Sequence, residues 1–169
     1  MEDHSSSSLS TLSLHTPAPE HSWAGGHQRH LAPPITLAAT FQLPSGCEVE
    51  GEPVYGRYGH PSRCHLETVL ASLESATHCL CFSSGMAAAH TVLQTLVPGD
   101  HVVAGNCLYG GVLSLIRQSR DLGVNVTFVP TEDPDKLGEV IRDNTKIVWL
   151  EICSNPSLKI LDLKKTVQA

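Results

Sequence analysis

The sequence lacks the features that would place the protein in a membrane, on nucleic acid or in a secretory pathway. With 41% hydrophobic and 17% charged residues, it has the composition of a globular protein, without a membrane span or disorder throughout. The formal net charge of -6 leaves no basic face for non-specific binding of nucleic acid. The first residues, MEDHSSSSLS, have no basic or apolar region of the kind that a secretory signal needs. We therefore expect neither nucleic acid nor a membrane among the partners.

Cysteines and histidines at metal-binding spacing are also missing. The six cysteines include no C-x-x-C pair and no zinc-ribbon spacing. Cys79 and Cys81 alternate within an apolar run, so we expect them on one face of a strand as small buried side chains. His21, His27 and His30 have no spacing that would bring them to one ion, and we predict no metal site. Cysteines used in this way fit a reduced, cytoplasmic setting.

The chain has enough residues for one domain with a core, and its composition changes twice along its length. Residues 1–30 are rich in Ser, His, Pro and Gly and have no hydrophobic period, so they are predicted to be a mobile leader. Residues 31–62, interrupted by proline, are predicted to be an extended arm and a loop. Residues 63–169 have a regular apolar pattern and are predicted to form the folded domain.

Amphipathic helices alternate with short apolar strands in the folded part. Strands are expected over residues 78–83, 101–104, 124–129 and 146–152. Helices are expected from Pro61 and Ser62 onward, with Leu66 on the inner face, and over residues 85–97, 111–122 and 134–143. Alternation of this kind predicts an α/β fold, with a parallel sheet covered by helices on both faces.

Three turns follow predicted strands and should meet at the carboxyl edge of that sheet, where ligands of parallel sheets bind. They contain Gly85, Tyr109 and Asn155. A glycine turn that opens a helix presents backbone N–H groups and the positive end of the helix dipole, which suits a phosphate. With Tyr55 and Arg57 in the preceding loop, the pattern predicts a site for a phosphorylated ligand.

Four segments in register resemble the Cys/Met-metabolism family of pyridoxal-phosphate enzymes, and within it they look most like the cystathionine gamma-lyases. The segments are Y-G-R-Y-G-H-P-S-R at 55–63, F-S-S-G-M-A-A at 82–88, L-Y-G-G at 108–111 and E-I-C-S-N-P-S-L-K at 151–159. The resemblance implies pyridoxal 5'-phosphate as cofactor. It also implies the fold, which is a partial parallel sheet of a fold-type I large domain with an extended N-terminal arm. On this reading, residues 63–169 are an incomplete cofactor-binding domain.

The resemblance assigns roles at the cofactor phosphate. Tyr55 and Arg57 would reach the phosphate of a neighbouring subunit's cofactor, for which a phenol and a guanidinium fork are suited. Ser84, Gly85 and Met86 would hold the phosphate of the chain's own cofactor, with glycine permitting close approach. Read without the family, the same residues are also compatible with a surface loop and an ordinary helix start.

Further roles concern the cofactor ring. Tyr109 would stack on the pyridine ring, and Asn155, aimed by Pro156, would bond the ring hydroxyl. Glu151 would lie at the pocket edge. Taken alone, the tyrosine could serve packing, and an Asn-Pro turn without a ligand is common.

The sequence departs from the family in two ways. His60 stands where the family has Asn, and Ile152 and Cys153 stand where it has Thr or Pro. The family's cofactor-binding lysine lies in a Ser-x-Thr-Lys segment and its ring acid in a Val-Asp-Asn-Thr strand, both downstream of the Asn-Pro turn. No such segment contains the lysines of this chain, which are Lys136, Lys146, Lys159, Lys164 and Lys165. We therefore predict no catalytic residue here and no activity of the chain by itself.

The implied parent reaction is trans-sulfuration, in which cystathionine yields cysteine, 2-oxobutanoate and ammonia. A sulfur amino acid would be the small-molecule substrate, and the family would assemble as a homo-oligomer, a homotetramer. The alternatives are a cystathionine gamma-synthase-like or methionine gamma-lyase-like chain, or a non-catalytic chain that associates with full-length homologous subunits.

Overall fold

The structure is a computed structural model, and it describes residues 8–9, 13, 34–41, 55–130 and 135–168. The chain forms two compact units, residues 1–81 and 82–169, and each is described by itself. The boundaries predicted at residues 30 and 62 remain predictions, and most of the predicted leader lies outside the described residues. None of the helices in the described part is long and apolar enough to cross a membrane.

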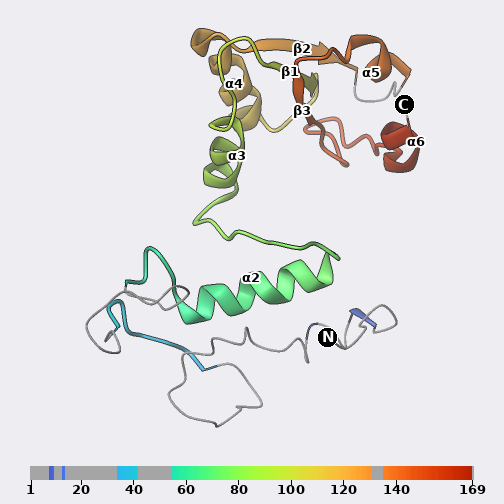
Figure 1. The fold of residues 1–169 in the computed structure, drawn as a ribbon. Helices are drawn as coiled ribbons and strands as arrows, with labels where there is room; N and C mark the ends of the chain where they lie inside the picture. The colour runs from blue at the N-terminus through green and yellow to red at the C-terminus, as the bar shows by residue number, and fades with distance from the viewer. Residues whose placement is uncertain (1–7, 10–12, 14–33, 42–54, 131–134, 169) are drawn as a thin grey trace. The chain divides into compact units, whose positions relative to one another are not determined.

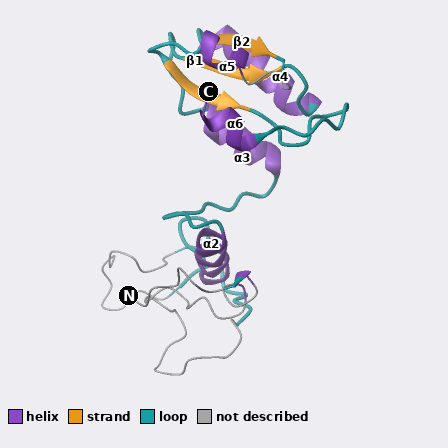
Figure 2. Ribbon diagram, turned by 90° about the vertical axis from the view of Figure 1, so that its right-hand side faces the viewer, coloured by secondary structure: helices purple, strands orange, loops and turns teal. Residues whose placement is uncertain are grey.

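The second unit is built on the parallel sheet that the sequence predicts (Figures 1 and 2). β1 (His101–Gly105) lies between β2 (Asn125–Val129) and β3 (Thr145–Trp149), and both pairings are parallel. Every residue of β1 is buried. The middle strand is therefore a rigid base for the loop that follows it.

Helices cover this sheet on two faces (Figure 1). α3 (Gly85–Leu93) and α4 (Gly110–Gln118) pack on one face, and α5 (Asp135–Val140) packs on the other. α6 (Leu163–Gln168) follows the last described turn. The larger core consists of buried apolar side chains from α3, α4 and the strands with their flanking loops: Ala89, Leu93, Val102, Ala104, Leu108, Val112, Ile116 and Val124.

Gly123 ends the helical stretch that begins with α4. A turn of 3-10 helix at Ser119–Leu122 continues α4, and Gly123 then takes a φ of 84°. That left-handed conformation favours glycine, and a Cβ at this position would also lie 3.0 Å from the Cβ of Pro98. The glycine therefore turns the chain sharply from α4 into β2.

His101 joins the three strands, linking the amino ends of β1 and β3 to the middle of β2. Its side chain is fully buried, with Nδ1 2.8 Å from the hydroxyl of Thr145 on β3 and Nε2 2.8 Å from the hydroxyl of Thr127 on β2. The Thr145 hydroxyl also accepts the N–H of Arg142 at 2.8 Å, so its own hydrogen can go to His101 Nδ1. Nε2 then carries the hydrogen that is donated to Thr127. Burial, with a smaller effect of the nearby Arg142 charge, lowers the pKa of His101 and favours this neutral form.

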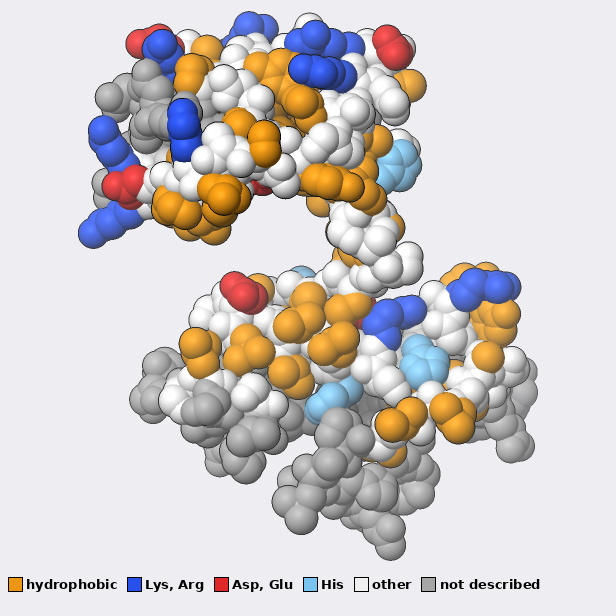
Figure 3. Space-filling model, turned by 180° about the vertical axis from the view of Figure 1, so that it is seen from behind, with side chains coloured by type: hydrophobic (Ala, Val, Ile, Leu, Met, Phe, Trp, Pro, Cys, Tyr) orange, Lys and Arg blue, Asp and Glu red, His pale blue; other side chains and the backbone are white. Residues whose placement is uncertain are grey.

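The described part of the first unit is centred on α2 (Pro61–Leu73), which begins at the predicted proline. The helix buries Ala71. Leu66, which the sequence predicts on the inner face, is 48% exposed, so that prediction is wrong. Figure 3 shows apolar side chains gathered over this helix on the face that it draws.

The strand predicted at residues 78–83 is not formed, and the segment has no regular structure. The N–H of Cys81 donates to the carboxylate of Glu67 at 2.9 Å, where a strand would use a carbonyl of its neighbour. Cys79 and Cys81 are partly exposed, and Leu80 between them is 73% exposed. Desolvation, the neighbouring Cys79 and the charge of Glu67 raise the pKa of the Cys81 thiol. The alternation of apolar residues therefore misidentified a connecting segment as a strand.

Candidate functional site

The second unit has an open pocket of about 630 Å³ at the carboxyl edge of its sheet. Tyr109 follows β1 and Glu151 follows β3, so the pocket lies where parallel sheets bind their ligands. Most of its wall is apolar. The lining residues are Ser84, Gly85, Met86, Ala88, Ala89, Val92, Tyr109, Val112, Trp149 and Glu151.

The start of α3 forms one wall of the pocket. Ser84 is the N-cap, and its Oγ accepts the N–H of Ala87 at 3.1 Å. Gly85 and Met86 are the first helical residues, whose N–H groups have no acceptor within the helix. A Cβ at Gly85 would meet no heavy atom within 4 Å, so this backbone borders open space. The helix start can therefore accept an anion at close range.

Tyr109 forms the facing wall. Its side chain is 52% exposed, and its N–H donates to Glu151 Oε1 at 2.8 Å. A Cβ on Gly111 would lie 2.7 Å from Cε1 of the tyrosine ring and 3.0 Å from Sδ of Met86. The missing side chain at position 111 thus makes room for the ring beside Met86. The geometry leaves a phenol face available for stacking on a flat ligand.

Asn155 lies in the turn after β3, outside the set of residues that line the pocket. The turn is well fixed: the buried Ser154 Oγ lies 2.8 Å from the Ser157 hydroxyl, and it accepts the N–H of Lys159 at 3.0 Å. The thiol of Cys107 donates to the Asn155 carbonyl oxygen at 3.4 Å. Through Cys107, this turn is tied to the loop that carries Tyr109.

Tyr55 and Arg57 belong to the first unit, and their geometry is described within it. The guanidinium of Arg57 lies 4.3 Å from the centre of the Tyr55 ring, a cation–π contact. Arg57 is exposed, whereas Tyr55 is half-buried and forms a bridge with Thr40. His60, the departure from the family pattern, meets the ring of Phe41 edge-on at 6.2 Å.

Sequence reasoning missed two parts of the pocket. Trp149 ends β3 and joins the wall, and no role was predicted for it from the sequence. The role of Gly111 was hidden because it depends on the side chains of two other residues. The strand predicted over residues 146–152 placed Trp149 in mid-strand, so the sequence did not indicate its place at the pocket.

No group of three His, Cys, Asp or Glu side chains is placed to hold a metal ion within the described ranges. The histidines of the predicted leader, His21, His27 and His30, lie outside those ranges.

A family model of Cys/Met metabolism PLP-dependent enzymes matches residues 11–169. The chain belongs to this family. The family's cofactor is pyridoxal phosphate, and the fold agrees with its solved structures. Those described as metB from Corynebacterium glutamicum and as cystathionine gamma-lyase from yeast superpose with TM-scores of 0.84 and 0.77, at 34% and 31% identity. In both cases 99% of this chain is covered, against 43% and 41% of the solved chains.

Curated relatives of the family carry several names. Rat cystathionine gamma-lyase is 36% identical over 162 residues, and cystathionine beta-lyase of Coxiella burnetii is 40% identical over 137 residues. The alignments cover 95% and 80% of this chain but 39% and 35% of those relatives. The chain thus spans about two fifths of the length of the relatives that it matches.

The pocket residues fit the family's cofactor. A phosphate needs donors without side-chain obstruction, and Gly85 offers a backbone bordering open space at a helix start. A pyridine ring needs a flat apolar surface, which the half-exposed Tyr109 provides within the same pocket. Both features line one pocket, so a single ligand there can contact them together.

Proposed function

We propose that this chain forms the cofactor-binding part of a trans-sulfuration enzyme of the cystathionine gamma-lyase type, which cleaves cystathionine to cysteine, 2-oxobutanoate and ammonia. When bound, pyridoxal phosphate supplies an electron sink for chemistry at the substrate's carbon skeleton. A reduced, cytoplasmic setting and assembly as a homotetramer belong to the same proposal. Support comes from the family match together with the pocket geometry.

The chain's own residues bind and orient in this proposal. The N–H groups of Gly85 and Met86 hold the phosphate, and Ser84 keeps the helix start in place through Ala87. Tyr109 covers one face of the ring and keeps water from it, while Glu151 fixes the tyrosine backbone. Asn155 bonds the ring hydroxyl from the adjoining turn. Tyr55 and Arg57 complete the phosphate site of a neighbouring subunit.

The observation that carries the proposal is that an open glycine at a helix start and a half-exposed tyrosine share one pocket. The test is a titration of the chain with pyridoxal phosphate and, separately, with pyridoxal, followed by equilibrium dialysis and by the fluorescence of Trp149. We expect at least about tenfold tighter binding of the phosphorylated ligand, since several charge-assisted bonds depend on it. Gly85→Val, which fills the cradle, should remove most of that preference. Equal affinity of the wild-type chain for both ligands would contradict the proposal.

The choice among family activities depends on the substrate. A cystathionine gamma-synthase-like or methionine gamma-lyase-like activity would use the same cofactor-binding residues. The chain by itself is expected to release no 2-oxobutanoate from cystathionine or from methionine, so this measurement separates the lyase candidates only in a protein that also contains the family's lysine segment. Release from methionine alone would favour the methionine gamma-lyase.

A second candidate is a non-catalytic role in which the chain associates with full-length homologous subunits. The exposed Arg57, stacked on the Tyr55 ring, favours it because its guanidinium is accessible to a partner. Co-expression with a tagged full-length homologue and co-purification tests the association. An Arg57→Ala chain that co-purifies as well as the wild type would show that this loop does not contribute.

A further inference from the structure

The Tyr55–Tyr58 turn carries Arg57 at its exposed tip. The N–H groups of Tyr58 and Gly59 both donate to the Tyr55 carbonyl oxygen, at 2.9 and 3.1 Å, and the N–H of Gly56 donates to Ala39 at 2.7 Å. Within the turn, the carbonyl oxygens of Gly56 and Tyr58, on either side of Arg57, do not accept any of these backbone hydrogen bonds. The direction of those two carbonyl oxygens matters, because an oxygen that faces an anion repels it.

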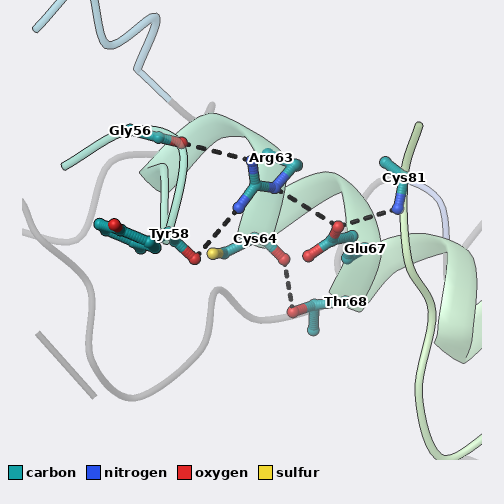
Figure 4. A network of polar contacts seen from close by, with 7 residues as sticks. All are labelled: Gly56, Tyr58, Arg63, Cys64, Glu67, Thr68 and Cys81. Carbon is teal, nitrogen blue, oxygen red and sulfur yellow. Dashed lines mark hydrogen bonds and ion pairs between the residues drawn. The ribbon is translucent and has the colours of Figure 1, made fainter. Parts of the chain in front are cut away.

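Arg63, in the first turn of α2, donates hydrogen bonds to both carbonyl oxygens (Figure 4). Its Nη1 donates to Gly56 O at 3.3 Å and its Nη2 to Tyr58 O at 3.4 Å. Its Nε lies 3.6 Å from Glu67 Oε1, one helical turn further on. The same carboxylate oxygen accepts the N–H of Cys81 at 2.9 Å, which holds the carboxylate in place.

This arrangement has an electrostatic consequence. A carbonyl oxygen that faces a phosphate repels it, so a turn that binds an anion has to direct its carbonyl groups elsewhere. Here one guanidinium fork holds the carbonyl groups on both sides of Arg57, and leaves Arg57 itself stacked on Tyr55 and exposed. The Arg63 guanidinium already faces three acceptors, the two carbonyl oxygens and the Glu67 carboxylate. Arg63 therefore holds the turn, whereas Arg57 is exposed to a ligand.

We propose that Arg63, held by Glu67, is a positioning residue that sets the Tyr55–Tyr58 turn for binding a phosphate group through Arg57. The inference rests on the proposed function, because it takes the ligand phosphate from there. Lysine cannot replace Arg63, since an ammonium on a flexible stem does not present a planar fork to two carbonyl groups at once.

The test uses the whole chain and two readouts. The first is amide hydrogen exchange at Tyr58 and Gly59, which should accelerate roughly tenfold in Arg63→Lys, because two side-chain bonds to the turn are weakened. Arg120→Lys is the matched control: its guanidinium also donates to a carbonyl, that of Val126 at 3.1 Å, but in the second unit. It should leave exchange at Tyr58 and Gly59 unchanged.

The second readout is the ratio of affinities for pyridoxal phosphate and pyridoxal. Arg57→Ala is the reference variant. The part of the preference for pyridoxal phosphate over pyridoxal that it loses is the contribution of the turn. Arg63→Lys should lose at least half of that contribution without changing the affinity for pyridoxal. Glu67→Gln, which keeps an oxygen for the Cys81 N–H but lacks the charge, should lose a smaller part.

The outcomes separate this inference from the proposed function. No preference for the phosphorylated ligand in the wild-type chain overturns both. A preference that survives intact in Arg63→Lys overturns the inference alone, and so does an unchanged ratio in Arg57→Ala. A purely structural role of Arg63 in α2 would raise exchange along the helix and leave the ratio unchanged, which also counts against the inference.

Discussion

Two places in the described part of the chain are proposed to bind a phosphate, and they are stabilised in different ways. At Gly85 the donors are backbone N–H groups of α3, a helix whose Ala89 and Leu93 are buried in the larger core. At the Tyr55–Tyr58 turn the proposed donor is the side chain of Arg57, and the turn is fastened to α2 by polar contacts of Arg63. α2 itself buries only Ala71 among its residues.

This difference shows how each place should respond to change. A helix start fixed by core packing keeps its geometry as long as the core is intact, and salt has little effect on it. A turn held by a guanidinium at 3.3 to 3.6 Å depends on charges that are partly exposed, so it is weaker and sensitive to salt. The helix start should therefore respond to loss of core packing, and the Tyr55–Tyr58 turn should respond to salt.

The largest effect is expected from Ile116→Ala. Ile116 is fully buried in the core that supports α3, and its truncation should destabilise the second unit by about 2–5 kcal/mol. Leu66→Ala in α2, where the side chain is half exposed, should cost less than about 1 kcal/mol. Hydrogen exchange of the β1 amides as a function of urea concentration measures the stability lost in Ile116→Ala. Similar losses of stability in Ile116→Ala and Leu66→Ala would contradict the expected difference between the two units.

A local effect is expected from Gly111→Ala. The added methyl group would lie 2.7 Å from the Tyr109 ring, so the ring has to move, and the affinity for pyridoxal phosphate should fall about tenfold. Gly110→Ala is the control, because its added methyl group meets nothing within 4 Å. Equilibrium dialysis of both variants gives the comparison, and equal affinities would show that the ring position is unimportant for binding.

A pH effect is expected from His101. Its pKa is lowered in the folded state, so the unfolded chain binds a proton more readily, and this contribution to stability is complete above the unfolded value of about 6.5. As the pH falls from about 6.5 toward the lowered folded pKa, the second unit should become progressively less stable. Urea midpoints at pH 7.5 and 5.5 measure the loss, which His101→Gln should reduce and His90→Gln, at an exposed site, should retain.

The smallest effect is expected from salt. Raising NaCl to about 1 M should speed amide exchange at Tyr58 and Gly59 severalfold at most, because screening weakens the Arg63–Glu67 pair. Exchange at β1 should not change. An acceleration in both units would mean that salt acts on the whole chain, without distinguishing the turn from the helix start.

Much of the sheet could be predicted from the sequence, because strands buried on both faces are apolar throughout. β1 follows this rule apart from His101, whereas β2 follows it only in part, because it includes Asn125 and Thr127 and buries only Val129. Gly123 ends the intervening helix where the sequence places it. The segment at 78–83 has a similar pattern, yet its Cys81 N–H is satisfied by the Glu67 carboxylate. Local composition cannot show whether a strand finds a neighbour or a side chain takes its hydrogen bonds.

The site could be predicted in its motifs and only partly in its contacts. Ser84, Gly85, Met86 and Tyr109 share one pocket, as expected from turns at one edge of a sheet. Two contacts depend on side-chain positions that no spacing rule gives. They are the close approach of the tyrosine ring to Gly111 and the hydrogen bonds of Arg63 to the turn. Asn155 follows the same strand as Glu151 but lies outside the pocket wall.

The bridge of His101 between two threonines has a consequence for how such a sheet can diversify. It links the amino ends of β1 and β3 to the middle of β2, whereas the pocket includes residues at the carboxyl ends of β1 and β3. Substitutions at those pocket residues can therefore alter which molecule is recognised without disturbing the hydrogen bonds of His101 to the two threonines. Ligand specificity can then change in evolution while the sheet stays the same.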